Sequence, residues 1–185
     1  MINNTPSDTE LISMFRDPHQ RERAFRLILA GYQEKLYWHI RRLVCIHEDA
    51  DDVLQNTMIK IWNGLPGFRE SSGLYTWMYR IASNEAITFL KSRQRERALL
   101  ADDPEDLIKN RFKSDPYYDG DELFAKLQVL ITRLPPKQQM VFRMKYFDDM
   151  TYEDMSIVLK TSVGALKASF HHAVRKIQAA FVRLD

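Results

Sequence analysis

The last quarter of the chain carries positive charge that no acidic residue opposes. Between Lys160 and Leu184 the sequence holds five basic residues and no Asp or Glu. Ser162 is a candidate N-cap for a helix in this stretch, and the small Ala165 follows it closely. Small residues let a helix backbone approach a duplex, and cations further along bind phosphates. The segment therefore predicts contact with DNA, although a solvated helix with cations near its C-terminus would have the same composition.

An apolar stripe defines the side of this helix that would face away from DNA. Leu166, Phe170 and Ile177 recur at steps of three and four residues, as on the buried side of an amphipathic helix. The residues predicted to meet DNA lie off this stripe: Ser162, Ala165, Lys167, Ala168, His171, His172, Arg175 and Lys176. A cation near the helix start can reach a base edge, whereas cations further along suit phosphates.

A shorter helix is expected directly before this one. Thr151 and Asp154 have the spacing of a capping box, and the helix that they begin would span residues 152–159. A tight turn at 160–161 separates it from the basic helix. A short helix, a tight turn and a longer helix form the layout of a helix-turn-helix, whose second helix enters the major groove of DNA.

Acidic and amide side chains gather on one face of an earlier predicted helix. The cluster comprises Asp51, Asp52, Gln55 and Asn56. Acids are stabilised in the first turn of a helix by its dipole, which accounts for the carboxylates but not for the amides. This polar face would suit a basic partner. A metal site is not expected, because the neighbouring His47-Glu48 pair lacks a second histidine four residues on.

Aromatic residues are interleaved with arginine and asparagine in the stretch that follows. The residues of interest are Phe68, Arg69, Trp77, Arg80 and Asn84. Bases of single-stranded nucleic acid stack on aromatic faces, so this composition suits an unpaired strand. Aromatic residues at helical spacing are also common in protein cores. The residues alone leave both interpretations open.

Helical spacing dominates the sequence, and period-two alternation is nearly absent. The predicted helices span residues 25–43, 50–65, 74–89, 123–134, 136–147, 152–159 and 163–184. Between the third and fourth, the stretch from Ala101 to Tyr118 is rich in Asp and Pro, and we expect a linker there with one short helix over 107–112. The predicted fold class is all-α, with two small helical domains joined by an acidic linker, the C-terminal one a helix-turn-helix.

Composition excludes several other classes of protein. The 185 residues carry 27 Lys and Arg against 25 Asp and Glu, and Cys45 is the only cysteine, so no intrachain disulfide and no thiolate zinc site are expected. The longest charge-free run, Ser71 to Tyr79, is far shorter than the ~20 residues of a membrane span. No secretion signal is evident, which predicts a cytoplasmic protein. No phosphate loop or nucleophile motif indicates an enzyme or a cofactor.

The ordered set of motifs resembles the bacterial RNA polymerase sigma factors of the extracytoplasmic-function type, in the sigma-70 family. The stretches that carry the resemblance are Asp51-Asp52-Val53-Leu54-Gln55-Asn56-Thr57 followed by Ile61-Trp62, Phe68-Arg69 followed by Tyr75-Thr76-Trp77-Met78-Tyr79-Arg80-Ile81-Ala82 with Asn84, Leu134-Pro135-Pro136-Lys137-Gln138-Gln139 with Val141-Phe142, Tyr152-Glu153-Asp154-Met155, and Ser162-Val163-Gly164-Ala165-Leu166-Lys167. The resemblance covers about residues 20–97 and 122–184.

Several positions depart from the family pattern. Asn56 replaces the usual acid, and Asp154 replaces the usual Glu. Ser169 stands where the family often has an Arg, and His172 stands where an Arg is common. The family's usual DNA contact at Ser169 is therefore not carried over.

The resemblance implies a promoter-recognition subunit with no catalytic residues, no metal and no cofactor. A domain over 1–97 would bind core RNA polymerase and would recognise and melt the −10 promoter element. A linker over 98–121 would thread through the polymerase, and a domain over 122–185 would read the −35 element. By analogy, the polymerase-binding residues are Asp51, Asp52, Gln55 and Asn56, and the −10 residues are Phe68, Arg69, Trp77, Arg80 and Asn84. The sequence leaves open whether an anti-sigma factor is a further partner, and it predicts no membrane insertion.

Two other classes of protein would also contain a helix-turn-helix or a helical bundle. A stand-alone helix-turn-helix regulator would bind DNA without polymerase, and a net charge of only +2 argues against it because such a chain gains little from phosphates alone. A helical adaptor would leave the basic face of the last helix without a role. Copurification with polymerase tests the first alternative, and salt-dependent DNA binding tests the second.

Overall fold

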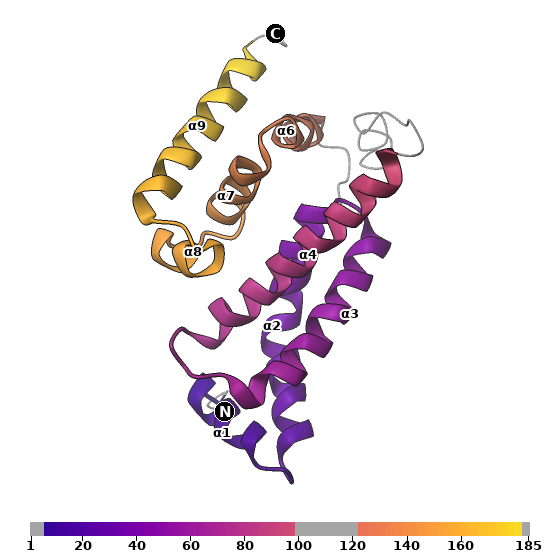
Figure 1. Cartoon of the computed structure of the whole chain (residues 1–185), viewed down its shortest axis with the longest axis vertical. Helices are drawn as coiled ribbons and strands as arrows, with labels where there is room; N and C mark the ends of the chain where they lie inside the picture. Colours follow the sequence, from indigo (N-terminus) through magenta and orange to yellow (C-terminus); the bar gives the residue numbers. More distant parts are fainter. Residues whose placement is uncertain (1–5, 99–121, 183–185) are drawn as a thin grey trace.

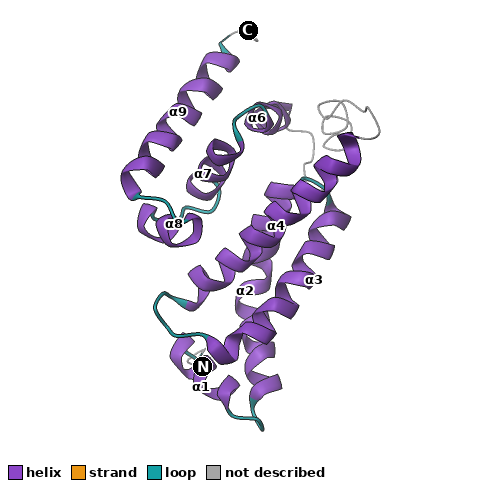
Figure 2. Ribbon diagram, viewed as in Figure 1, coloured by secondary structure: helices purple, strands orange, loops and turns teal. Residues whose placement is uncertain are grey.

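The computed structural model describes residues 6–98 and 122–182, and every regular element in these two ranges is helical (Figures 1 and 2). In chain order the elements are α1 (Asp8–Arg16), α2 (Arg21–Val44), α3 (His47–Gly64), the 3-10 turn η1 (Leu65–Gly67), α4 (Leu74–Ala98), α6 (Glu122–Thr132), α7 (Pro136–Tyr146), α8 (Tyr152–Leu159) and α9 (Val163–Phe181). The prediction of an all-α protein is confirmed over these ranges. The expected linker and its short helix at 107–112 lie outside the described residues.

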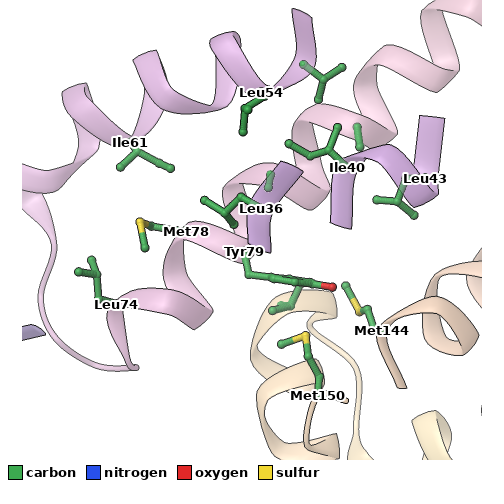
Figure 3. Close-up of a cluster of buried hydrophobic side chains, with 14 of the residues drawn as sticks. Leu36, Ile40, Leu43, Leu54, Ile61, Leu74, Met78, Tyr79, Met144 and Met150 are labelled. Carbon is green, nitrogen blue, oxygen red and sulfur yellow. The ribbon is translucent and has the colours of Figure 1, made fainter. Parts of the chain in front are cut away.

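Helices α2, α3 and α4 form the N-terminal bundle, which has an apolar interior (Figures 1 and 3). Leu36 and Ile40 of α2, Ile61 of α3 and Met78 of α4 are all fully buried in it. The stop predicted at Pro66-Gly67 becomes the 3-10 turn η1, which closes α3. The apolar spacing in the sequence therefore identified both the helices and the sides on which they pack.

Helix α1 was not predicted, although the sequence contains a signal for it. Ser7 and Glu10 form a complete capping box: the Ser7 hydroxyl accepts from the Glu10 N–H, and the Glu10 carboxylate accepts from the Ser7 N–H at 2.7 Å. Leu11, Ile12 and Phe15 are then buried against the bundle. A serine followed three residues later by a glutamate, ahead of an apolar run, would have located this helix.

The helix-turn-helix forms with the predicted boundaries at its turn. Thr151 caps α8 by accepting from the Asp154 N–H at 3.1 Å, and Ser162 caps α9 by accepting from the Ala165 N–H at 3.4 Å. Between them Lys160 has φ 50°, a left-handed conformation that ends α8. Helix α9 ends at Phe181, somewhat before the predicted end at residue 184.

The predicted capping box at α8 forms only in part: the Asp154 carboxylate does not accept from the Thr151 N–H. It accepts instead from the hydroxyl of Thr151 at 2.7 Å and from the hydroxyl of Thr76 at 3.0 Å. Thr76 belongs to α4, so this carboxylate joins the C-terminal helices to the N-terminal bundle. A prediction made from local spacing missed a contact between residues 78 positions apart.

The C-terminal helices take part in two apolar clusters. One is their own and contains Leu130, Ile131, Leu134, Phe142, Ala173 and Ile177. The other continues the interior of the N-terminal bundle, because Met144 and Met150 pack into it beside Tyr79 of α4 (Figure 3). The two groups of helices are thus in direct contact, which the sequence did not predict. None of the described helices combines the length and the apolar character needed to cross a bilayer.

Candidate nucleic-acid interfaces

The basic face of α9 is open to solvent along its length. The predicted residues that are exposed comprise Ser162, Ala165, Lys167, Ala168, His171, His172, Arg175 and Lys176. Leu166, Ala173 and Ile177 on the opposite side are buried, so the predicted stripe fixes the orientation of the helix. From Ala165 to Lys176 this face is about 16 Å long, at ~1.5 Å of rise per residue.

Two cations on this face have defined neighbours. The Lys167 ammonium lies 5.7 Å from the centre of the Tyr152 ring, a cation–π contact across the turn of the motif. The Lys176 ammonium donates to the Gln138 side chain of α7 at 3.1 Å. Since α9 contains no acidic residue, its exposed face presents positive charge and small side chains, as duplex DNA requires.

The second interface lies on α4 and on the loop before it. Trp77, Arg80 and Asn84 are spaced three and four residues apart and share one side of α4, with Trp77 and Arg80 half-buried and Asn84 exposed. Arg69 is exposed in the preceding loop. The structure therefore brings four of the five predicted −10 residues to accessible positions around the start of α4.

Phe68 differs from the other four because it is 5% exposed. Its ring lies 5.0 Å from the Trp77 ring, and its carbonyl oxygen accepts from the Arg16 guanidinium at 3.0 Å. A Cβ added to Gly64 would stand 3.0 Å from the Trp77 ring, so a larger residue there would have to displace the ring. In this structure the Phe68 ring packs against the Trp77 ring and is almost wholly shielded from solvent.

The polar face of α3 contains both a buried acidic residue and exposed polar residues. Asp49 is buried, and its carboxylate accepts from Arg93 at 2.8 Å, so it stabilises the contact between α3 and α4. The predicted polymerase-binding set, by contrast, is wholly exposed: Asp51, Asp52, Gln55 and Asn56. Among the described residues no group of His, Cys, Asp and Glu is arranged to hold a metal ion.

Sequence reasoning missed a buried polar group that lies between the two sets of helices. The side chain of Asp148, in the turn between α7 and α8, is 3% exposed. It accepts from the Arg42 guanidinium and from the Tyr79 hydroxyl, and its Oδ2 lies 3.0 Å from His39 Nδ1. We call these four residues the Asp148 cluster. The sequence gives one sign of the Asp148 cluster. The apolar spacing around His39 places this histidine on the buried side of α2.

Burial and charge shift the titration of this cluster. Burial by itself would raise the pKa of Asp148, but its bonds with His39, Arg42 and Tyr79 prevail and hold the pKa below the ordinary value of an aspartate. Burial lowers the pKa of His39 despite the nearby carboxylate, and the Arg42 and Arg143 cations lower it further. The cluster is thus stable with an ionised Asp148 paired to Arg42.

Two family models match this chain. The model for Sigma-70 region 2 matches residues 28–96, and the model for Sigma-70, region 4 matches residues 124–177, together more than half of the chain. The first match contains the candidate interface on α4 and the polar face of α3. The second contains the helix-turn-helix.

Curated relatives align over most of their length. RNA polymerase sigma-H factor of Pseudomonas aeruginosa is 31% identical, with 86% of each chain covered. The ECF RNA polymerase sigma-E factor of Haemophilus influenzae is 27% identical, covering 85% of this chain and 87% of its own. The sigma-E factor of Escherichia coli K12 is 28% identical, covering 82% and 83%.

Solved structures share the fold. The structure of CnrH in complex with the cytosolic domain of CnrY aligns with a TM-score of 0.71 and 20% identity, covering 96% of this chain and 99% of that one. The sigma factor RpoE in complex with the anti-sigma factor NepR from Bartonella quintana aligns with a TM-score of 0.65 and 21% identity, covering 84% and 94%.

These matches confirm the resemblance that the motifs indicated. Sigma factors are not enzymes: they bind core RNA polymerase and direct initiation at promoters, with region 2 recognising and melting the −10 element and region 4 recognising the −35 element. The chain belongs to the sigma-70 family of RNA polymerase sigma factors, as a member of the extracytoplasmic-function type built from regions 2 and 4.

Proposed function

We propose that this sigma factor divides promoter recognition among three surfaces. The α9 face reads the −35 duplex, the α4 face holds the −10 element, and the α3 face binds core polymerase. The observation that carries the proposal is the exposure of the whole basic α9 face together with the absence of any acid from that helix. A helix with this composition repels no phosphate and can enter a major groove.

On α9 we assign base contacts to Lys167 and phosphate contacts to Arg175 and Lys176. Ala165 and Ala168 keep the helix close to the DNA, with His171 and His172 as additional donors. On α4 we assign Trp77 as a stacking surface for a base taken out of the duplex, and Arg80 and Asn84 as polar contacts to that strand. Because Phe68 is buried under Trp77, its proposed role is to hold that ring in place.

We also propose the domain limits 1–97 for region 2, 98–121 for the linker and 122–185 for region 4. The family matches at 28–96 and 124–177 support this division. Residues 98–121 carry more acids than bases, and an acidic linker would not compete with the two DNA-binding surfaces for phosphates.

Two further properties are proposed from the relatives. Both solved structures reported above are complexes with a second protein: CnrH with the cytosolic domain of CnrY, and the sigma factor RpoE with the anti-sigma factor NepR. We propose that an anti-sigma factor also binds this chain. The family relationship supports a cytoplasmic location, where core polymerase is found.

The decisive experiment for the function is in vitro transcription with core polymerase over a library of promoters. We expect enrichment of one −35 and −10 pair, and no enrichment without the sigma factor. A matched pair of variants tests the α3 face: Asp51→Arg with Asp52→Arg, against Glu34→Arg as an exposed charge reversal on α2.

The α3 double variant should weaken core binding by about tenfold or more, because opposite charge steers and holds the partner. Its helix content by circular dichroism should not change. Equal core affinity of wild-type and double-variant protein would contradict the assignment of this face. DNA protection by the free chain as strong as by the holoenzyme would favour the stand-alone regulator instead.

A further inference from the structure

The proposed −10 surface contains two acidic residues. From residue 68 to residue 93 the sequence has only Glu70 and Glu85 as acids. Glu70 directly follows Arg69 in the loop before α4, and Glu85 directly follows Asn84 on α4 itself. A DNA strand carries one negative charge per phosphate, so an uncompensated carboxylate beside such a contact repels the strand. Binding of DNA by this surface therefore depends on what neutralises the two acids.

Glu85 is paired with a cation from α3, which lies beside α4 (Figure 1). The Lys60 ammonium donates to the Glu85 carboxylate and forms an ion pair across the contact between the two helices. The Glu85 side chain is only 15% exposed, whereas that of Lys60 is 57% exposed. Because a shielded carboxylate is costly without a cation, Lys60 compensates this charge more effectively than a fully solvated partner would.

Glu70 is paired with a cation from α1. The Arg16 guanidinium lies 3.2 Å from the Glu70 carboxylate, and it also donates to the Phe68 carbonyl oxygen at 3.0 Å. Both side chains of this pair are partly exposed, so water weakens it relative to the pair on α4. The arrangement is nevertheless the same in both places: the acid belongs to the proposed −10 surface, and the cation comes from another helix.

Helical geometry places Glu85 at the border of the −10 face of α4. Successive residues of an α-helix are turned by about 100°, so Glu85 points to one side of Asn84. That side is the one nearest α3, because Lys60 of α3 meets the carboxylate there. From Trp77 to Glu85 the helix rises about 12 Å, which is the length of three to four nucleotides at ~3.4 Å each. A strand that runs from Trp77 to Asn84 therefore also passes Glu85.

We propose that Lys60 and Arg16 are positioning residues for the −10 strand, which act by neutralising the Glu85 and Glu70 carboxylates. Neither cation has to touch the DNA, because each acts through the acid with which it pairs. The inference rests on the proposed binding of the −10 element by α4, and the experiment below measures that binding by itself.

The first test is a double-mutant cycle on Lys60 and Glu85. Holoenzyme assembled with each variant binds a labelled single-stranded oligonucleotide that carries the −10 sequence selected from the promoter library. Lys60→Met should weaken this binding about fivefold at low salt, because the unpaired Glu85 repels the phosphates. Addition of Glu85→Gln should restore the affinity to within about twofold of wild type, and Lys60→Arg should retain it. A loss that persists in the double variant would overturn the proposal and assign Lys60 a direct contact.

Salt dependence separates repulsion of the DNA from a defect in the fold. The deficit of Lys60→Met should shrink as salt is raised, because ions screen the repulsion between Glu85 and the phosphates. A deficit of the same size at every salt concentration would mean that the ion pair serves only to join α3 to α4. Lys126→Met is the matched control, since it removes the same charge from an exposed position on α6. An equally large loss with Lys126→Met would attribute the effect to net charge and contradict the proposal.

The second test applies the same cycle to Arg16 and Glu70. Arg16→Met should weaken binding of the oligonucleotide, and Glu70→Gln in addition should restore part of the affinity. Recovery is partial because the bond from Arg16 to the Phe68 carbonyl oxygen is still lost. No recovery on addition of Glu70→Gln would overturn the role proposed for Arg16.

Wild-type holoenzyme measures the proposed function of α4 by itself. It should bind the −10 oligonucleotide more tightly than an oligonucleotide of the same composition in scrambled order. Equal binding of the two would show that the assignment of the −10 element to α4 is wrong. A clear wild-type preference together with unchanged affinity of Lys60→Met would show that only the role proposed for Lys60 is wrong.

Discussion

The two helices proposed to bind DNA, α4 and α9, present their side chains in different ways. On α9 the residues proposed to contact DNA are exposed, on a helix whose other side buries Leu166 and Ile177. On α4 the central aromatic, Trp77, is half-buried and rests on the buried Phe68. An intact duplex is read by side chains that reach into its groove, whereas an unstacked base needs a fixed surface to receive it. The difference agrees with the proposal that α9 reads duplex DNA and that α4 holds an unpaired strand.

The largest expected effect is on DNA melting, which is proposed to depend on α4 and not on α9. Trp77→Ala should make the free energy of open-complex formation less favourable by about 1–3 kcal/mol, because one stacking surface is lost. Permanganate reactivity of the melted region measures this. Tyr146→Ala is the control, since Tyr146 is 60% exposed on α7 and outside both interfaces.

The folded state of the Trp77 variant must be established by its helix content, because the ring also packs against Gly64. Unchanged permanganate reactivity in a folded variant would mean that α4 does not hold unpaired bases. Asn84→Ala should relax the −10 preference while melting still occurs, since Asn84 is exposed and packs no aromatic partner in the contacts described.

The second effect tests sequence reading by α9. Lys167→Ala should change which −35 sequence is selected, with a loss of about 1–3 kcal/mol in discrimination if its ammonium reads a base edge. Promoter selection from a randomised −35 library measures the change. If the preferred −35 sequence is the same as for the wild-type protein, Lys167 is a surface cation. The assignment of base reading to this residue of α9 would then be wrong.

A third effect distinguishes phosphate contacts from base contacts on the same helix. Arg175→Ala should weaken all promoters about equally and reduce the slope of log affinity against log salt by about one. Arg23→Ala removes the same charge from an exposed position on α2 and serves as the control. A slope that falls equally in both variants would show only the effect of net charge.

The smallest expected effect concerns the Asp148 cluster, where the two regions meet. Burial lowers the pKa of His39 below its ordinary value of about 6.5, with Arg42 and Arg143 acting in the same direction and Asp148 opposing it. The protein with regions 2 and 4 in contact thus binds fewer protons than it would with them apart, so the contact is most stable above this value and weakens as the pH falls below it. The lowered pKa of Asp148 acts in the same direction, because protonation of this carboxylate at more acid pH also weakens the contact.

We therefore expect the radius of gyration of the free protein, measured by small-angle scattering, to increase between pH 7.5 and pH 5.5. The variant His39→Gln cannot gain the charge and should show no such increase over this range. A wild-type radius that is constant, or that decreases on acidification, would contradict the assigned direction of the His39 pKa.

Local signals predicted most of the secondary structure. The boundaries of α8 were correct because Thr151 and the left-handed turn at Lys160 are determined by a few adjacent residues. The end of α3 was correct because proline and glycine act on the backbone directly. Helix α1 was not predicted, although its capping box of Ser7 and Glu10 is equally local.

The sequence predicted side-chain exposure well on α9 but less well on α4 and α3. On α9 a single apolar stripe determines the exposed side, and each residue predicted to meet DNA is exposed. On α4 the same method could not separate Phe68 from Trp77, since both are aromatic and burial depends on what packs above them. Similarly, Asp49 and Asp51 look alike in sequence, and only the position of Arg93 makes one of them structural.

The sequence by itself determined the helices, the helix-turn-helix and the family, because capping, apolar periodicity and ordered motifs all act over a few residues. The tertiary structure alone decided how regions 2 and 4 meet. Asp148 lies 109 positions from His39 and 106 from Arg42, and an aspartate beside an aspartate in a turn carries no local sign of burial. Its charge is stabilised only when helices from both regions enclose it, which is a property of packing and not of spacing.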